Sequence, residues 1–510
     1  MKPQNDWTFY GRQQEVAALR DLFLRDRWFF IRVTGRRRIG KTALVRQALQ
    51  AAGRDRVAYL QIDDNEPAGV VATARRHLAL SGVPEAMLPT DLQSLAARLA
   101  DLAAEGYVVV LDEFQYFQKK SLYPFNSMLQ FEVDRFRLGE RPAKGGMVLL
   151  GSLHTEMMAL LEDRRAPLFG RLSGGISLGH LDAQALLQIC DRHTDRDPHR
   201  LLFLWGLFQG VPKYWQDAWE LGVLGASRRE VLRALFFEGP APLREEGRAW
   251  LLEELRGRYD LFLRYVAEHP GCTHADIVAH ADTVKGYGDG QPGFYLKALE
   301  DRFALIHRRQ PAFAKPGARH GRYTIADGFL QAWLGALADP ISLAGIRPTA
   351  HLVAVADERL ATVEGTALER LVAWLYQERS RLGIGDLALT APIAGWWDRV
   401  GAEIDLVAQD AQSRRLRLGS CKRSPEKLIA DLPRFEGHIT RLLTRHPELA
   451  GWTLEKVAIA PALSFEHRTA IERQGWRAQD LTDLVEGLGS AGTLSGTELD
   501  TFEAEPFEAS

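Results

Sequence analysis

The chain of 510 residues contains few cysteines, almost no net charge and no long apolar run. Its three cysteines are odd in number and widely separated, which argues against a disulfide framework or a zinc cluster and fits a reducing cytoplasm. A formal net charge of -2 provides no overall attraction to nucleic acid or anionic lipid, but it does not exclude a local basic face. The sequence shows neither a signal-peptide pattern nor a run that could span a bilayer, so we expect a cytoplasmic protein without a membrane partner. The fourteen histidines show no metal-ligand spacing.

A glycine-punctuated loop is the most informative segment of the chain. The run 30–34 leads into the pattern G-x-x-x-x-G-K-T, and a helix-forming stretch at 43–50 follows it. In this context such a loop turns its backbone N–H groups around nucleotide phosphates, and the start of the helix adds positive potential. Lys41 would reach the β- and γ-phosphates, and the Thr42 hydroxyl would complete a Mg²⁺ shell. The candidate nucleotide-binding residues of the loop are Gly35, Arg36, Arg37, Arg38, Ile39, Gly40, Lys41, Thr42 and Ala43.

Two acids follow a second apolar run. Residues 107–111 are continuously apolar, as in a buried parallel strand, and Asp112 and Glu113 come directly after them. Ligands of open α/β sheets lie beyond the carboxyl ends of the strands, so both acids would face the same crevice as the loop. Asp112 suits a metal-holding role, and Glu113 suits a role in polarising the attacking water. The two segments together favour nucleotide hydrolysis over nucleotide binding alone.

The first half of the chain alternates between strand and helix patterns. Within residues 1–222 this alternation predicts an α/β fold with a parallel P-loop sheet, and the wholly helical pattern from 182 onward predicts a helical lid. Residues 223–345 show short helices followed by a hairpin, which is the order of a winged-helix domain. The expected strands of the sheet are 28–33, 57–62, 107–111, 147–150 and 176–178. The expected helices and strands of the winged-helix domain are 275–280, 294–303, 304–309 and 322–325.

The last third of the chain predicts another α/β domain and a tail. Residues 346–488 show a long helix at 366–379 and strands at 402–408, 416–421 and 452–459. No Lys or Arg occurs after Arg477, and small and acidic residues dominate the end of the chain. Such a composition cannot bury enough apolar surface to order itself, so we expect residues 489–510 to be disordered. The length is consistent with about three domains at roughly 150 residues each.

Further motifs occur in a fixed order along the chain. A Phe-x-Gly-Arg box at 9–15 contains Gly11 and Arg12, and the acidic pair continues as Asp112-Glu113-Phe114-Gln115. Ser152 closes the run 147–151, and Gly170-Arg171, Gly210-x-Pro212-x-Tyr214 and Tyr323-x-Ile325-x-Asp327-x-Phe329 follow. With these motifs, nearly the whole chain resembles the archaeal-type AAA-related (STAND-like) P-loop ATPases, which carry a C-terminal PD-(D/E)XK nuclease-like domain of unknown function.

The resemblance implies roles for residues outside the loop. Gly11 and Arg12 would lie near the adenine. Ser152 would hydrogen-bond the γ-phosphate or the attacking water, or it is simply a polar strand end. Arg171 would stabilise charge on the transferring phosphoryl group in the manner of an arginine finger, or it is a solvated surface arginine. ATP and Mg²⁺ are the implied ligands.

The C-terminal domain departs from the nuclease pattern at one position. Glu369 fits the acid on the first helix, Asp405 fits the acid after a strand, and Lys422 fits the lysine of the next strand. Ser420 stands where a carboxylate belongs, and a neutral hydroxyl binds Mg²⁺ far more weakly than a carboxylate does. Because this carboxylate is missing, we expect a degenerate, inactive site. The open alternative is that Glu403, two residues before Asp405 and on the same strand face, replaces the absent acid.

Several functions remain open at this stage. The leading hypothesis is a Mg²⁺-dependent ATPase that acts as a nucleotide-controlled switch and engages DNA or a protein partner through its winged-helix and C-terminal domains. The alternatives are an ATP-controlled DNA nuclease and an ATP-binding scaffold with little turnover. Basic residues near the expected wing (Arg308, Arg309 and Arg322) and the segment 396–399 are candidate nucleic-acid contacts. For 396–399, a half-buried aromatic pair at a strand edge is the alternative. The sequence does not determine the oligomeric state.

Overall fold

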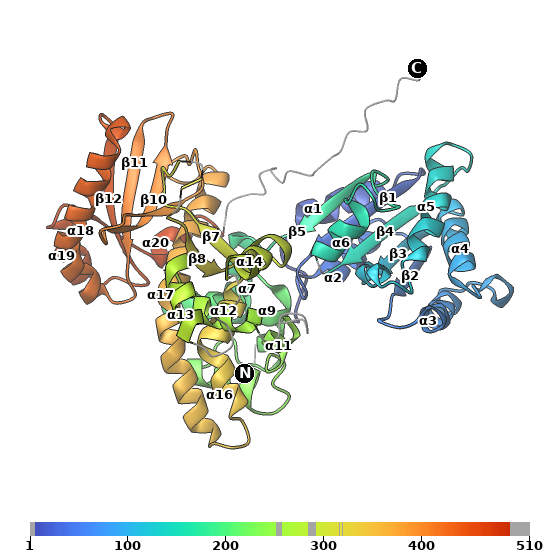
Figure 1. Ribbon diagram of the computed structural model, residues 1–510, viewed down its shortest axis with the longest axis horizontal. Helices are drawn as coiled ribbons and strands as arrows, with labels where there is room; N and C mark the ends of the chain where they lie inside the picture. Colours follow the sequence, from blue (N-terminus) through green and yellow to red (C-terminus); the bar gives the residue numbers. More distant parts are fainter. Residues whose placement is uncertain are drawn as a thin grey trace. The chain divides into compact units, whose positions relative to one another are not determined.

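The computed structural model describes residues 6–152, 154–250, 258–283, 292–315, 317–318 and 320–489. The predicted acidic tail therefore lies outside the described residues, apart from Gly489. The chain divides into two compact units (Figure 1). Of the described residues, the N-terminal unit comprises Thr8–Leu181 and Val211–Lys213, and the C-terminal unit comprises Asp182–Gly210 and 214–489, together with Asp6 and Trp7. The division at Asp182 precedes the expected domain boundary at 222, and the expected four-part division stays a prediction.

The N-terminal unit is built on a parallel sheet, as predicted. Its strand order is β2-β3-β4-β1-β5, and every described neighbouring pair is parallel. The strands are β1 (Phe29–Gly35), β2 (Val57–Gln61), β3 (Val108–Asp112), β4 (Gly146–Gly151) and β5 (Gly174–Leu178). The helices are α1 (Gln13–Phe23), α2 (Lys41–Ala51), α3 (Pro67–Leu80), α4 (Leu92–Ala104), α5 (Pro124–Arg137) and α6 (His154–Leu161). Every residue of β3 is buried, which explains its continuous apolar sequence.

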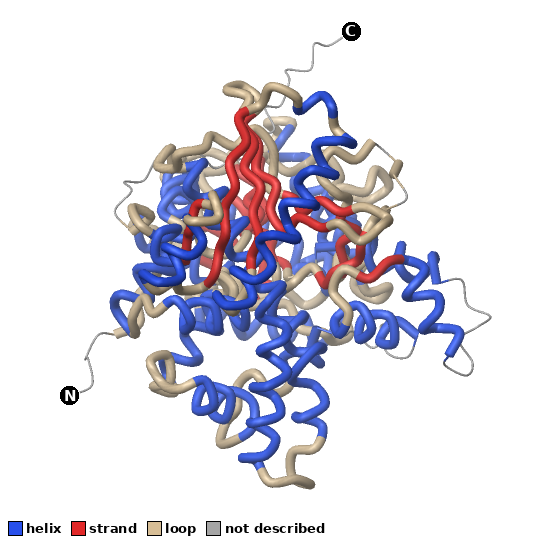
Figure 2. Tube along the Cα trace, turned by 90° about the vertical axis from the view of Figure 1, so that its left-hand side faces the viewer, coloured by secondary structure: helices blue, strands red, loops and turns tan. Residues whose placement is uncertain are grey.

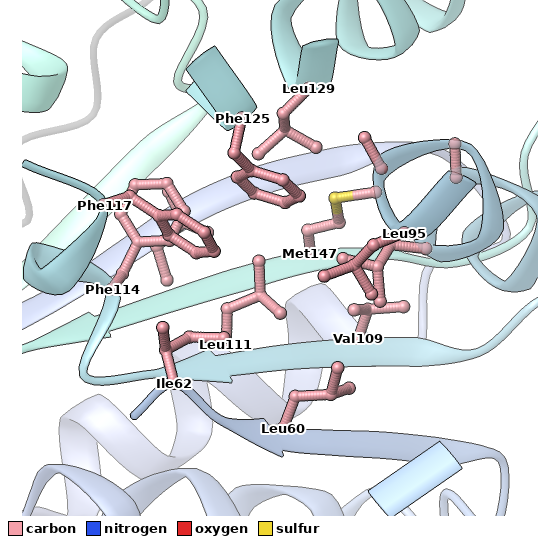
Figure 3. Close-up of a cluster of buried hydrophobic side chains, with 14 of the residues drawn as sticks. Leu60, Ile62, Leu95, Val109, Leu111, Phe114, Phe117, Phe125, Leu129 and Met147 are labelled. Atoms are coloured by element: carbon pink, nitrogen blue, oxygen red, sulfur yellow. The ribbon is translucent and has the colours of Figure 1, made fainter. Parts of the chain in front are cut away.

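A buried apolar cluster supports the segment that follows β3 (Figure 3). A short 3₁₀ helix, η2 (Phe114–Gln118), begins directly after the acidic pair. Its Phe114 and Phe117 are fully buried, and Phe117 stacks on Phe125 of α5 with 4.1 Å between ring centroids. Burial of each such ring contributes about 1.5–3 kcal/mol. The backbone that carries Asp112, Glu113 and Gln115 is therefore held firmly on both sides.

The C-terminal unit begins with helices that pack on one long helix. The expected lid consists of α7 (Ala183–His193), α8 (Pro198–Phe208) and α9 (Pro212–Glu220). The predicted helix 366–379 is the end of the much longer α17 (Thr349–Arg381). Trp205 of α8 stacks on Trp374 of α17 at 6.0 Å, and Glu378 accepts a hydrogen bond from the Ala183 backbone N–H at 3.3 Å. Because α7 and α8 make these contacts with α17, the segment Asp182–Gly210 belongs to the C-terminal unit.

A small antiparallel sheet with the strand order β6-β8-β7 contains the predicted hairpin, which is formed by β7 and β8. Helices α10 (Arg228–Leu232), α11 (Glu246–Trp250) and α12 (Arg258–Glu268) precede it. Next come β6 (Cys272–Thr273), α13 (His274–Thr283), α14 (Pro292–Lys297), β7 (Ile306–Arg309) and β8 (Arg322–Ile325), then α15 (Gly328–Ala332) and α16 (Ala338–Ser342). The helix order and the hairpin agree with the sequence prediction. Assignment of this region as a winged-helix domain stays a prediction.

The second large sheet has the order β13-β12-β11-β10-β9. Strands β9, β10 and β11 are antiparallel, whereas β11, β12 and β13 are parallel. Its elements are β9 (Ala394–Trp397), β10 (Glu403–Asp410), β11 (Arg415–Cys421), α18 (Pro425–Arg445), β12 (Thr453–Ala460), α19 (Phe465–Glu472), β13 (Arg477–Asp480) and α20 (Leu481–Val485). Apolar residues of α18 and α19 cover one face of this sheet. Figure 2 shows the strands in red among the helices in blue.

Candidate active site

The glycine-punctuated loop leaves β1 at the carboxyl edge of the parallel sheet and ends where α2 begins. Gly35 has φ +151°, and a Cβ placed there would lie 2.7 Å from the Leu178 carbonyl oxygen of β5. Gly40 has φ +96° and directly precedes α2. A side chain at Gly35 would collide with backbone, and both glycines hold conformations that L-residues rarely adopt. The loop therefore has the backbone of a phosphate cradle followed by a helix N-terminus.

Lys41 is folded into this loop. Its Nζ donates hydrogen bonds to the Gly35 carbonyl at 3.0 Å, to the Arg36 carbonyl at 3.1 Å and to Ser152 Oγ at 2.9 Å. The side chain is 6% exposed, and burial lowers the pKa of Lys41 to about 8 against the opposing effect of Glu113 and Asp112. A cation tied to carbonyl and hydroxyl oxygens in this way is placed to exchange those partners for phosphate oxygens.

Thr42 and Asp112 are in direct contact. Thr42 Oγ1 donates to Asp112 Oδ2 at 2.8 Å, and the Tyr59 hydroxyl of β2 donates to the same oxygen. Burial and the Asp112 contact raise the pKa of Tyr59. The sequence analysis missed Tyr59, because only the strand order shows that β2 lies beside β3. A hydroxyl and one carboxylate suit Mg²⁺, which usually takes few protein ligands and completes its shell with water and phosphate.

Glu113 follows in a left-handed backbone conformation, with φ +58°. Its Oε2 accepts a hydrogen bond from Gln115 Nε2 and lies 3.4 Å from Ser152 Oγ. Ser152 thus contacts both Glu113 and Lys41, which joins the ends of β3 and β4 to the loop. Among the described residues, no group of three or more His, Cys, Asp or Glu side chains is arranged to hold a metal by itself.

The predicted adenine box lies on the same edge of the sheet. Gly11 and Arg12 both have positive φ values, and Arg12 directly precedes α1. The Arg12 guanidinium donates to the carbonyl of Gly179, the residue after β5, and lies 3.4 Å from Glu15 Oε1. Because β5 is the neighbour of β1, the box is held beside the loop.

Arg171 does not join this cluster. Its Nε and Nη2 donate to the two carboxylate oxygens of Asp134 on α5, each at 2.9 Å. The residue precedes β5 and therefore lies at the amino edge of the sheet, whereas the loop lies at the carboxyl edge. The seven residues of β1 rise about 20 Å, farther than an arginine side chain reaches. In this structure Arg171 is engaged by Asp134, and its predicted role toward the transferring phosphoryl group stays a prediction.

The four residues of the expected degenerate nuclease site do converge in the C-terminal unit. Asp405 Oδ2 accepts hydrogen bonds from Lys422 Nζ at 3.0 Å, from Ser420 Oγ at 3.3 Å and from the Cys421 backbone N–H at 2.8 Å. Burial, and then the charge of Asp405, raise the pKa of Glu369 to about 8. Glu403, the alternative acid, accepts a hydrogen bond from Arg322 Nη1 through its Oε1 at 2.5 Å, and its charge also helps to raise the pKa of Glu369.

The wing candidates and the tryptophan pair make contacts within the chain. Arg322 of β8 lies over the Trp397 ring at 4.6 Å, in addition to its ion pair with Glu403. Trp396 is 2% exposed, and Trp397 Nε1 donates to the His320 carbonyl at 2.9 Å. The alternative interpretation of 396–399, an aromatic pair at a strand edge, fits these contacts, whereas stacking of nucleic acid on Trp396 does not. Arg308 and Arg309 remain exposed.

Comparisons with known proteins find distant likenesses. No family model matches the chain. The chain is 24% identical over 445 residues to Uncharacterized protein MJECL04 of Methanocaldococcus jannaschii, covering 84% of this chain and 91% of that protein. Among solved structures it is similar to the Walker-type ATPase PABY2304 of Pyrococcus abyssi (17% identity, TM-score 0.48, covering 66% of this chain and 98% of that chain). It is also similar to the ORC2 protein of Aeropyrum pernix (16% identity, TM-score 0.43, 71% and 96% covered). No helix within the described part of the chain is long and apolar enough to cross a membrane.

Proposed function

We propose that the chain binds and hydrolyses ATP with Mg²⁺ and works as a nucleotide-controlled switch. The observation that carries this proposal is the convergence of Lys41, Thr42, Asp112, Glu113 and Ser152 at the carboxyl edge of β1, β3 and β4. These residues come from three separated segments and supply a phosphate-binding cation, a metal-binding pair and a carboxylate for water.

Each side chain has a definite task in this reaction. The loop N–H groups and Lys41 hold the phosphates, and Thr42 and Asp112 would hold Mg²⁺. Bound Mg²⁺ neutralises negative charge that develops on the phosphate oxygens. Glu113 orients a water molecule and accepts its proton, while Ser152 hydrogen-bonds the γ-phosphate or that water. Gly11 and Arg12 lie beside the adenine in this proposal. ATP is chosen over other nucleotides because the segment 9–15 resembles the adenine-side box of the P-loop ATPase family.

The switch proposal rests on the segment that returns to the loop from the helical region. Val211–Lys213 belongs to the N-terminal unit, and a Cβ placed on Gly40 would lie 3.8 Å from Pro212 Cγ. Pro212 is also the first residue of α9. Nucleotide binding that moves the loop would therefore move the start of α9. We expect ATP and Mg²⁺ to slow amide hydrogen exchange at 211–220, and unchanged exchange there would contradict the switch.

Two variants test hydrolysis. Lys41→Ala should lose nucleotide binding, because it removes the only side-chain cation that the motif places over the phosphates. Glu113→Gln should keep ATP affinity and lose turnover, since it removes the proton acceptor. Glu140→Gln, an exposed glutamate of the same unit, is the matched control. Wild-type turnover in Glu113→Gln would contradict the proposed role. Absence of turnover in the wild-type protein would favour the scaffold alternative.

The C-terminal site supports a second candidate function. Because Glu369, Asp405, Ser420 and Lys422 converge, we propose that the second sheet is a nuclease-like domain that has lost one metal-binding acid. Lys422 neutralises Asp405, and Arg322 neutralises Glu403. These pairs favour a binding role toward DNA or a protein partner over cleavage. Arg308 and Arg309 are the wing residues still available for phosphate contacts.

A further inference from the structure

Gln115 is a buried glutamine between two residues of the proposed active site. It is 3% exposed and lies on η2, between the fully buried Phe114 and Phe117. Its Nε2 donates to Glu113 Oε2, and its Oε1 accepts from the Ser152 backbone N–H at 3.3 Å. One amide therefore bridges the ends of β3 and β4, and its backbone is anchored by the aromatic core (Figure 3).

The bridge completes a closed polar network. Ser152 Oγ lies 3.4 Å from Glu113 Oε2 and accepts from Lys41 Nζ at 2.9 Å. Glu113 thus has one carboxylate oxygen shared between Gln115 and Ser152. Its left-handed backbone conformation is unusual for a residue with a side chain. Amide donors that keep a fixed position restrict where such a carboxylate can point.

We propose that Gln115 is a positioning residue that fixes the carboxylate of Glu113 relative to Ser152, and thereby relative to Lys41. Gln115 itself makes no contact with the phosphate-binding loop in these hydrogen bonds, so it acts through its two neighbours. When phosphate replaces Ser152 as a hydrogen-bond partner of Lys41, Ser152 is released from Lys41. A shift of Ser152 then alters the position of the Glu113 carboxylate, because Ser152 contacts Glu113 directly and through the Gln115 amide. This inference rests on the proposed ATP hydrolysis.

Two substitutions at Gln115 separate positioning from a structural role. Gln115→Leu keeps the approximate volume and removes both hydrogen bonds. It should lower kcat for ATP by about 10- to 100-fold with little change in KM, as loss of a hydrogen bond to a charged group predicts. Gln115→Glu places a second carboxylate against Glu113 Oε2, and repulsion between the two carboxylates should lower kcat with little change in KM. Gln118, an exposed glutamine at the end of the same helix, provides the matched controls Gln118→Leu and Gln118→Glu.

Binding of a fluorescent ATP analogue to each variant shows whether the site is intact. If Gln115→Leu does not fold, Gln115→Asn, which keeps the amide but is too short for both contacts, serves in its place. Wild-type kcat in the Leu, Asn or Glu variant would overturn the inference while leaving the proposed hydrolysis intact. Failure of the wild-type protein to hydrolyse ATP would instead overturn the proposed function.

Discussion

Nucleotide affinity should depend steeply on pH through Lys41. Without nucleotide, burial lowers the pKa of this side chain to about 8, although the nearby charges of Glu113 and Asp112 oppose the shift. The hydrogen bonds described for its ammonium group go to neutral oxygens. Phosphate oxygens stabilise the ammonium form, so binding raises the pKa toward or above the ordinary value of about 10.4. Binding is therefore coupled to proton uptake whenever the pH lies above about 8.

The magnitude follows from this shift. Below about pH 8 most chains carry a charged Lys41 and the dissociation constant for ATP should be constant. Above about pH 8 the charged fraction falls tenfold per unit, so the dissociation constant should rise by about tenfold at pH 9, or about 1.4 kcal/mol. The same shift affects folding: the unfolded chain binds the proton more tightly between about pH 8 and pH 10.4, so the free energy of unfolding without nucleotide rises with pH in that window.

Titration of a fluorescent ATP analogue between about pH 7 and pH 9.5 tests the coupling, and calorimetry in buffers of different ionisation enthalpy measures the proton uptake. Lys41→Arg should abolish the pH dependence of whatever binding remains, because a guanidinium stays charged throughout this range. Lys120→Ala, at an exposed lysine of the same unit, should keep the wild-type dependence. A dissociation constant that stays flat across the range, or proton release on binding, would refute the reasoning.

Three further predictions concern the metal, the hairpin and the second sheet. Asp112→Asn should raise the Mg²⁺ concentration needed for half-maximal hydrolysis, because it removes a unit of charge beside Thr42; an unchanged Mg²⁺ titration would place the metal elsewhere. Arg322→Ala should lower the free energy of unfolding by about 1–2 kcal/mol, through loss of the Trp397 and Glu403 contacts. Urea denaturation measures this loss. The control Arg309→Ala, at an exposed residue of the same hairpin, should change the free energy of unfolding by less than about 0.5 kcal/mol. The wild-type protein should show no Mg²⁺- or Mn²⁺-dependent cleavage of DNA, and Ser420→Glu should strengthen Mn²⁺ binding in calorimetry while Ser420→Ala does not. Robust wild-type cleavage that disappears in Asp405→Ala would establish the nuclease alternative instead.

Local patterns predicted much of the N-terminal unit. The continuous apolar run before Asp112 became β3, because a strand covered on both faces of a parallel sheet is apolar throughout. The mostly apolar run before the loop, interrupted by Arg32, became β1. The pairing of Thr42 with Asp112 followed from the rule that the carboxyl ends of such strands share one edge. The roles of the site residues in binding and catalysis stay predictions.

Long-range packing was not predictable in the same way. The sequence analysis found only the end of α17, although its first half carries buried Leu352, Val353, Ala356 and Leu360 at helical spacing, a local signal that was missed. Arg322 is different, because it looks like a free basic residue in the sequence but is held by the distant Trp397 and Glu403.

The sequence by itself determined the loop, the acidic pair and the alternation of strand and helix, because each depends on neighbours within a few residues. Only the tertiary structure decided the strand order, which brings Tyr59 to Asp112 and Gln115 to Ser152 and sends Arg171 to the opposite edge. Residues far apart in the chain meet through the way the sheet is assembled, and the free energy that fixes that assembly is distributed over the whole buried core.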